Sequence, residues 1–198
     1  MHALALRTSP IAHVRIALIG LGQRGLRTLQ RYADIEGAEI CAIADLTEEK
    51  VKEAESALKE GQQKPTTAFY GTEAWRKACD LPEIDLVYIC TDWLSHTEIA
   101  CYSMQKGKHG AVEVPAALTI KECETLVRTA ERTQRHCFMT ENCCYDIFAL
   151  ATRKMAQEGL FGDIHHCEGA YIHRLMPSDK GNWMAESYAS HAGNPYPT

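Results

Sequence analysis

The sequence predicts an α/β protein in which a doubly wound parallel sheet is followed by the beginning of a second α+β domain. Short apolar runs alternate with longer amphipathic segments over about 130 residues, which is typical of parallel strands joined by helices. Glycines follow the first apolar run at positions 20, 22 and 25. An acidic residue, Asp45, ends the second run. Together these three observations favour the Rossmann-like class of doubly wound folds.

Six segments have the composition of buried parallel strands, because they are short and rich in apolar, β-branched or aromatic residues. They are residues 14–19, 38–45, 69–71, 85–91, 109–115 and 136–142. The stretches between them predict helices over residues 26–35, 46–61, 72–79, 96–107 and 119–134. Thr47 and Thr119 are of the type that caps a helix N-terminus.

The pattern changes after Asn142. Residues 145–159 predict another helix, and residues 163–173 alternate like a strand of a new sheet. We therefore expect residues 1–12 to form an N-terminal tail and residues 13–142 a cofactor-binding domain. Residues 143–198 are expected to be the incomplete start of a second domain.

Composition excludes several classes of protein. The 198 residues carry a net charge of −5 without a basic patch, so nucleic acid is not an expected partner. No apolar stretch approaches the ~20 residues that span a membrane, and the first dozen residues are too short for a secretory signal. We expect a cytoplasmic protein whose nine cysteines are reduced. Adjacent Cys143 and Cys144 do not fit a zinc knuckle, so no metal is expected.

Residues Gly20, Gly22 and Gly25 form the pattern G-x-G-x-x-G between a strand and a helix. Gly20 permits a tight turn, Gly22 lets backbone N–H groups approach a pyrophosphate, and Gly25 lets helix and strand pack closely. The helix N-terminus favours the negative charge. Gln23 and Arg24 lie beside the same phosphates by position. The alternative is a glycine-rich turn without a ligand, with Arg24 a surface charge.

Asp45 stands 20 residues after Gly25, at the end of the second predicted strand. Its carboxylate can accept a hydrogen bond from a ribose hydroxyl. Leu46 follows it, and no arginine is present there to accept a 2′-phosphate. The sequence therefore predicts NAD, rather than NADP, as the cofactor.

Three further motifs lie at the predicted carboxyl ends of strands, where open parallel sheets bind ligands. They are T-D-W-L-S-H at 91–96, E-V-P at 113–115 and E-N-C-C-Y at 141–145. With G-L-G-Q-R-G at 20–25, they resemble the Gfo/Idh/MocA family from about Val14 to the end of the chain. Members of that family pair a Rossmann domain with a larger sheet domain for sugars or polyols.

Val114 departs from the dehydrogenases of that family, which usually have lysine between this glutamate and proline. The combination of E-V-P, W-x-x-H, E-N-C-C-Y, G-A-Y-I-H and H-x-G-N-P-Y-P-T resembles one branch more closely. That branch is the NAD-dependent glycosidases of glycoside hydrolase family 109, first known as α-N-acetylgalactosaminidases.

The resemblance implies a role for each matched position. Gln23, Arg24 and Asp45 would hold the adenosine side of NAD. The nicotinamide side would be lined by Trp93, His96, Glu113, Val114 and Asn142. Tyr171 would contact the sugar, and Tyr145 and Tyr196 would serve catalysis.

Structural alternatives stand beside several of these roles. Tyr145 could simply open a helix, His96 could belong to a capping region, and Trp93 could be a hydrophobic plug. Glu113 ends a buried strand, where an unpaired carboxylate is costly, so a ligand or a hydrogen-bond partner is expected.

The resemblance also implies a shortened chain. The branch continues Y-P-T with a histidine, one residue beyond Thr198, and it has arginines where this chain has Met176 and Met184. An incomplete second sheet leaves an unpaired edge, so we expect a homo-oligomer formed through that sheet.

Three functions are open. The first is a glycosidase that acts on an N-acetylhexosaminide by transient C3 oxidation and elimination, or an inactive shortened form of such an enzyme. The second is a sugar or polyol dehydrogenase, which would release NADH. The third is a non-catalytic module that binds NAD.

Overall fold

The computed structural model describes residues 2–32, 34–61 and 66–170. The chain divides into two compact units, residues 1–140 and residues 141–198.

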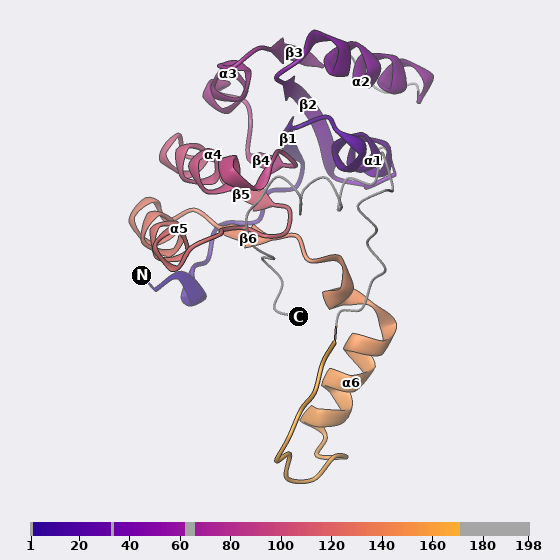
Figure 1. Ribbon diagram of the computed structural model, residues 1–198, viewed down its shortest axis with the longest axis vertical. Helices are drawn as coiled ribbons and strands as arrows, with labels where there is room; N and C mark the ends of the chain where they lie inside the picture. The colour runs from indigo at the N-terminus through magenta and orange to yellow at the C-terminus, as the bar shows by residue number, and fades with distance from the viewer. Residues whose placement is uncertain (1, 33, 62–65, 171–198) are drawn as a thin grey trace, which may run out of the picture. The chain divides into compact units, whose positions relative to one another are not determined.

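A six-stranded parallel sheet forms the centre of the first unit, with the strand order β3-β2-β1-β4-β5-β6 (Figure 1). The strands are β1 (Val14–Ile19), β2 (Ala38–Asp45), β3 (Thr67–Tyr70), β4 (Leu86–Ile89), β5 (His109–Val112) and β6 (Cys137–Met139). β1 pairs with β2 on one side and with β4 on the other. The chain thus winds outward from β1 in both directions, which confirms the predicted doubly wound parallel sheet.

Helices cover both faces of this sheet. Helices α1 (Gln23–Tyr32) and α2 (Glu48–Glu60) pack on one face. Helices α3 (Ala74–Asp80), α4 (Trp93–Gln105) and α5 (Ile120–Thr133) pack on the other. Successive side chains of β1 alternate between the two cores, which is why its whole sequence is apolar after Arg15.

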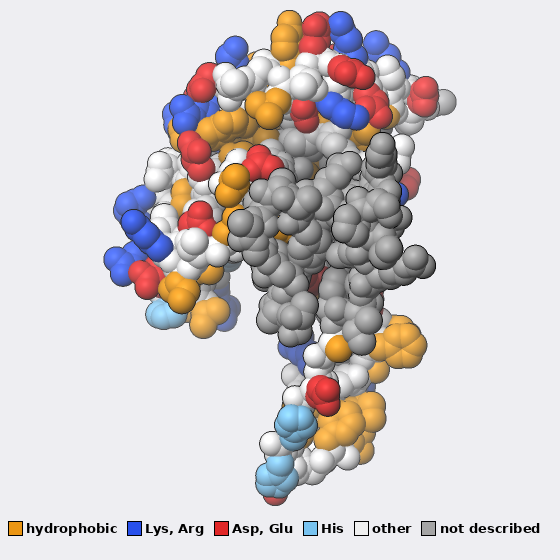
Figure 2. Space-filling view, in the orientation of Figure 1, with side chains coloured by type: hydrophobic (Ala, Val, Ile, Leu, Met, Phe, Trp, Pro, Cys, Tyr) orange, Lys and Arg blue, Asp and Glu red, His pale blue; other side chains and the backbone are white. Residues whose placement is uncertain are grey.

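Charged side chains lie on the outer surfaces of the helices. On the face seen in Figure 2, Lys and Arg side chains are interspersed with Asp and Glu side chains over α2 and α3. No helix in the described part of the chain combines the length and the apolar character needed to cross a bilayer.

Side-chain caps set the starts of three helices. The Thr119 hydroxyl accepts a hydrogen bond from Glu122 N, and the Glu122 carboxylate accepts one from Thr119 N, so α5 begins with a capping box. Thr47 caps α2 as expected. Asp92 accepts from Leu94 N at 3.0 Å and starts α4 at Trp93, three residues before the predicted start. A local cap therefore overrides the apolar periodicity used to place that helix.

Three strands are shorter than predicted. β4 ends at Ile89, β5 at Val112 and β6 at Met139, because the polar segments that follow leave the sheet. The backbone N–H of Glu113 still donates to Ile89 O at 3.0 Å. Pro115 has no N–H and cannot continue the ladder.

The first residues of the chain contact α5. Residues Ala3–Ala5 form a short 3-10 helix, η1, and Leu6 is buried. Ala3 N donates to Glu131 Oε1 at 3.0 Å. Part of the segment expected to be a tail is thus packed on the folded unit.

The second unit contains the short helix η2 (Asn142–Tyr145) and the helix α6 (Ile147–Gln157). Residues 163–170 have no regular structure, so the strand predicted over 163–173 is wrong for them; residues 171–173 lie outside the described residues. An alternating pattern selects the faces of a strand, but a strand also needs a neighbour to pair with. Among the described residues, 163–170 have no such neighbour.

Arg15 and Asp85 fix the amino ends of β1 and β4. Asp85 Oδ2 accepts from Arg15 N at 3.0 Å and from Nε at 2.9 Å, and Oδ1 accepts from Nη2 at 3.0 Å. Hydrogen bonds from the Arg15 guanidinium hold the pKa of Asp85 below its usual value. The Asp85 side chain is only 18% exposed, so this pair is shielded from solvent on the carboxylate side.

We expect Asp85→Asn to lower the free energy of unfolding by about 1–3 kcal/mol at neutral pH, since the negative charge and one of the two acceptor oxygens facing Arg15 are lost. A carboxyl with a lowered folded pKa stabilises above its ordinary pKa of about 4 and loses that contribution as pH falls through the folded pKa. Urea unfolding at pH about 7 and about 3 should therefore show the two proteins converge in acid. An equal difference at both pH values would contradict this account.

Candidate functional site

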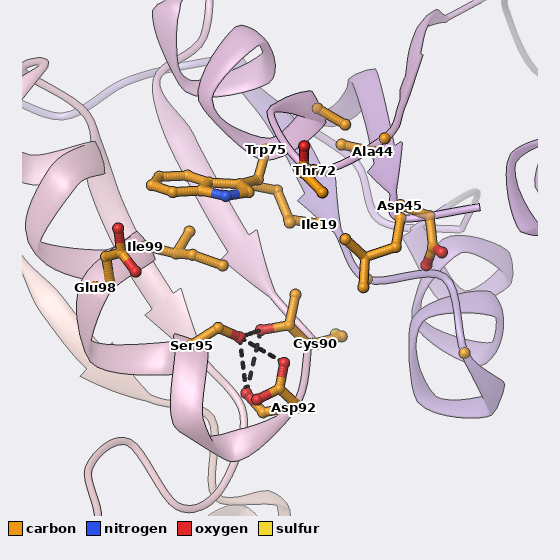
Figure 3. A pocket seen from close by; sticks show the side chains of 16 residues that line it. Ile19, Ala44, Asp45, Thr72, Trp75, Cys90, Asp92, Ser95, Glu98 and Ile99 are labelled. Atoms are coloured by element: carbon orange, nitrogen blue, oxygen red, sulfur yellow. Dashed lines mark hydrogen bonds between the residues drawn. The ribbon is translucent and has the colours of Figure 1, made fainter. Parts of the chain in front are cut away.

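A cavity of about 350 Å³ lies at the carboxyl ends of β1, β2 and β4 (Figure 3). Its walls come from the loop after β1, the end of β2, the residues around the start of α3, and the first turns of α4. This is the place where the strand order reverses from β2 to β4 around β1. Open parallel sheets bind ligands at such a reversal.

Two glycines of the loop after β1 occupy positions that admit no side chain. Gly20 has a φ of +88°, and a Cβ there would lie 2.5 Å from Cys90 O. A Cβ on Gly25 would lie 1.9 Å from Gly20 O. The turn therefore packs directly against the end of β4 and against the first turn of α1.

Gly22 is different, because a Cβ at this position would meet nothing within 4 Å. It lines the cavity just before α1 begins at Gln23. The open space beside its backbone is what a ligand needs in order to approach the N–H groups at a helix N-terminus.

Asp45, at the end of β2, lines the cavity (Figure 3). Its Oδ2 accepts from Leu21 N at 2.7 Å, and its Oδ1 accepts from Thr47 N at 3.0 Å and from Thr47 Oγ1 at 3.3 Å. A carboxylate offers about four acceptor positions, so acceptor capacity remains for a hydroxyl group.

Arg24, Tyr88 and Glu113 form a network that joins α1, β4 and the end of β5. Arg24 Nε lies 2.9 Å from Glu113 Oε2, and Tyr88 Oη donates to Glu113 Oε1 at 2.8 Å. Burial raises the pKa of Tyr88, which keeps the hydroxyl protonated as a donor. Glu113 is only 8% exposed, and the two partners compensate its buried charge. Arg24, which we expected beside phosphates, is thus paired with Glu113.

His96 is buried in the first turns of α4, with 1% of its surface exposed. Its Nδ1 lies 2.7 Å from Pro115 O and its Nε2 lies 3.1 Å from Thr91 O. The ring therefore ties the segment after β5 to the segment after β4. Trp93, the first residue of α4, is also buried. The cofactor roles of both residues, and of Val114 beside Pro115, stay predictions.

The remaining predicted site residues do not belong to the first unit. Asn142 and Tyr145 are the first and last residues of η2, in the second unit. Tyr145 is exposed there. Tyr171 and Tyr196 lie outside the described residues. The part these four residues play in a site stays a prediction.

Several cavity residues were not expected from the sequence. Thr72 and Trp75 follow β3, and Ile99 lies within α4. The first two come after the carboxyl end of a strand, and this rule could have identified them. Ile99 carries no such signal, because only the packing of α4 brings it to the cavity.

The cavity is acidic. Asp45, Asp92 and Glu98 line it, and none of its described lining residues is Lys, Arg or His. Burial raises the pKa of Cys90, so its thiol adds no charge. Phosphate groups would therefore depend on backbone N–H groups and the α1 N-terminus. Within residues 2–32, 34–61 and 66–170, no group of three or more His, Cys, Asp or Glu side chains could hold a metal ion.

Comparison with protein families gives a match over residues 14–141. The matching family is Gfo/Idh/MocA, described as an oxidoreductase family with an NAD-binding Rossmann fold. The predicted resemblance to this family is thereby confirmed.

Curated relatives match the whole chain. It is 50% identical over 206 residues to an α-N-acetylgalactosaminidase of Bacteroides fragilis, covering 100% of this chain and 48% of that protein. It is 45% identical over 201 residues to a glycosyl hydrolase family 109 protein of Porphyromonas gingivalis, covering 100% of this chain and 43% of that protein. The chain thus spans about half the length of the curated relatives it matches.

Solved structures share the fold. A myo-inositol 2-dehydrogenase from Lactobacillus plantarum matches with a TM-score of 0.66 and 22% identity, over 77% of this chain and 43% of that chain. A putative oxidoreductase from Klebsiella pneumoniae matches with a TM-score of 0.62 and 27% identity, over 76% of this chain and 41% of that chain. Both support the Rossmann-like α/β fold.

Substitution by alanine should affect stability differently at Gly25, which is tightly packed, and at Gly22, which faces open space. Gly25→Ala places a Cβ against the backbone of the preceding turn, so we expect the free energy of unfolding to fall by at least about 2 kcal/mol. Gly22→Ala meets open space and should change it by no more than about 0.5 kcal/mol. Chemical denaturation of both variants without added ligand measures this difference. Similar losses in the two variants would contradict the packing described for the turn.

Proposed function

The chain belongs to the Gfo/Idh/MocA oxidoreductase family, which has an NAD-binding Rossmann fold. From this we propose that the chain binds NAD and serves an NAD-dependent glycosidase reaction on an N-acetylhexosaminide. The observation that carries the proposal is the glycine turn at 20–25, which lines one cavity together with Asp45. The 50% identity to an α-N-acetylgalactosaminidase favours the glycosidase over other activities.

The residues present fit the adenosine side of NAD. Gly22 leaves the backbone at the start of α1 open to a pyrophosphate. Asp45 would accept hydrogen bonds from the ribose, and Leu46 offers no positive charge to a 2′-phosphate. Gln23 and Arg24 are proposed neighbours of the phosphates. For Arg24, this contact would compete with the ion pair to Glu113.

On the nicotinamide side, the proposed residues are Trp93, His96, Glu113, Val114 and Asn142. The short contacts of the two His96 ring nitrogens with backbone carbonyl oxygens, and the pairing of Glu113 with Arg24 and Tyr88, support a positioning role, because they fix the segments after β4 and β5. Val114 provides no amine at the position of the dehydrogenase lysine. This favours a reaction without net oxidation of the sugar.

When bound, NAD would supply a reversible hydride acceptor for C3 of the sugar, which makes the C2 proton acidic and permits elimination of the aglycone. The protein must then remove the C2 proton, protonate the leaving oxygen and return a proton as water adds. Tyr145 and Tyr196 are proposed for these proton transfers, and Tyr171 for contact with the sugar. Such groups act best when their pKa lies near the working pH.

Binding of NAD can be tested on the purified chain. We expect denaturation to release NAD in near-stoichiometric amount, detected by absorbance and mass spectrometry. Gly22→Ala should weaken NAD binding at least about tenfold, because the added Cβ occupies the approach of the pyrophosphate. Unchanged ligand-free stability of this variant is the control. Equal affinity in both proteins would show that the pyrophosphate does not lie against Gly22.

The reaction can be tested with an aryl α-N-acetylgalactosaminide, NAD and deuterated water. We expect release of the aglycone and incorporation of deuterium at C2 of the sugar, without accumulation of NADH. Accumulation of NADH from the free sugar would instead indicate a dehydrogenase. Binding of NAD without either reaction would leave a non-catalytic module.

A further inference from the structure

The indole of Trp75 lines the cavity at a distance from the Asp45 carboxylate. In Figure 3, Trp75, Ile99 and Glu98 lie toward one side of the view and Asp45 toward the other. Trp75 belongs to the first turn of α3, and Ile99 comes from α4. An aromatic ring and an aliphatic side chain thus line the same part of the cavity.

The indole is held by contacts outside the cavity. The Arg76 guanidinium carbon lies 4.6 Å from the centroid of the Trp75 ring, and the Tyr102 ring meets the indole edge-to-face at 5.2 Å and 81°. Arg76 is itself bound to Glu73 at 3.2 Å and to Glu98 at 2.9 Å. A cation over an aromatic ring and an edge-to-face ring pair are both attractive. Trp75 is therefore fixed before any ligand arrives.

The chemistry around Trp75 defines the group that it would take. The lining contains no Lys, Arg or His, and although Glu98 is paired with Arg76, which does not line the cavity, the lining carboxylates are hydrogen-bond acceptors that suit a ring carrying N–H donors. A fixed indole suits a flat, uncharged aromatic ring, which it can stack against. A purine with an exocyclic amine has all these properties.

We propose that Trp75 is the stacking platform for the adenine ring of an adenine nucleotide, and that Arg76 and Tyr102 hold it in position. The inference rests on the proposed binding of NAD and names the residue that sets affinity for its adenine half. The competing interpretation is that Trp75 only fills space, since it also packs against the core formed with α3, α4 and α5.

Titration calorimetry with ADP-ribose, which lacks nicotinamide, tests the proposal on the full chain. Trp75→Ala should weaken binding about 5- to 150-fold, which corresponds to the loss of one base–aromatic stack. Trp75→Phe keeps a ring and should stay within about fivefold of the parent. Phe138→Ala is the matched control, because Phe138 is an aromatic residue of β6 outside the cavity. Its affinity should be unchanged.

Indole fluorescence provides a second measurement with AMP, which also lacks the second phosphate and ribose. AMP should quench the parent chain and Phe138→Ala, and the quenching should be lost in Trp75→Phe. The chain has three tryptophans, so the comparison assigns the signal to one of them. This signal reports contact with the base, which a space-filling role for Trp75 would not produce.

The outcomes separate the two proposals. Unchanged ADP-ribose affinity in Trp75→Ala, or quenching that survives Trp75→Phe, overturns the role of Trp75 while NAD binding stands. Quenching by AMP that depends on Trp75, in a chain that does not bind NAD, supports the adenine site and overturns the proposed cofactor. Absence of binding to AMP, ADP-ribose and NAD overturns both.

Discussion

The close approach of the β1–α1 turn to the end of β4 is the constraint on which the rest of the first unit depends. Gly20 turns the chain with a positive φ, where its backbone lies against Cys90, and Gly25 lets α1 begin directly above that turn. Larger residues would push α1 away from the sheet. Leu21 N donates to Asp45, so the same turn also fixes the end of β2. A cavity bounded by three strands results from one close backbone contact.

The sheet could be predicted because parallel strands buried on both faces are apolar along their whole length. The ends of the helices and strands were less predictable. Asp92 caps α4 and makes it start before its predicted first residue, and Pro115 prevents further pairing of the chain after β5. Residues 163–170 show what an alternating pattern leaves undetermined. Their alternation indicates two faces, but it contains no information on whether a neighbouring strand is present to satisfy the backbone.

The candidate site was predictable where function depends on local backbone and less so where it depends on packing. The glycines of the turn lie close together in the sequence, and Asp45 follows Gly25 by 20 residues. This spacing was enough to predict them as parts of one site. Trp75 and Ile99 meet only because α3 and α4 pack on the same face of the sheet. Glu113 was expected to need a partner, but its pairing with Arg24 depends on how far the Arg24 side chain reaches from the start of α1 toward the end of β5.

The strand order also has a consequence for biosynthesis. β1 is made first, yet it acquires its second neighbour only when β4 has been completed at Ile89. At about 5–20 residues per second, the ribosome needs a few seconds to pass from β2 to that point. During this interval one edge of an apolar strand lacks its partner, and such an edge is where a nascent chain can aggregate. Among the interior strands of the sheet, β1 is therefore the one whose edge stays open for longest during synthesis.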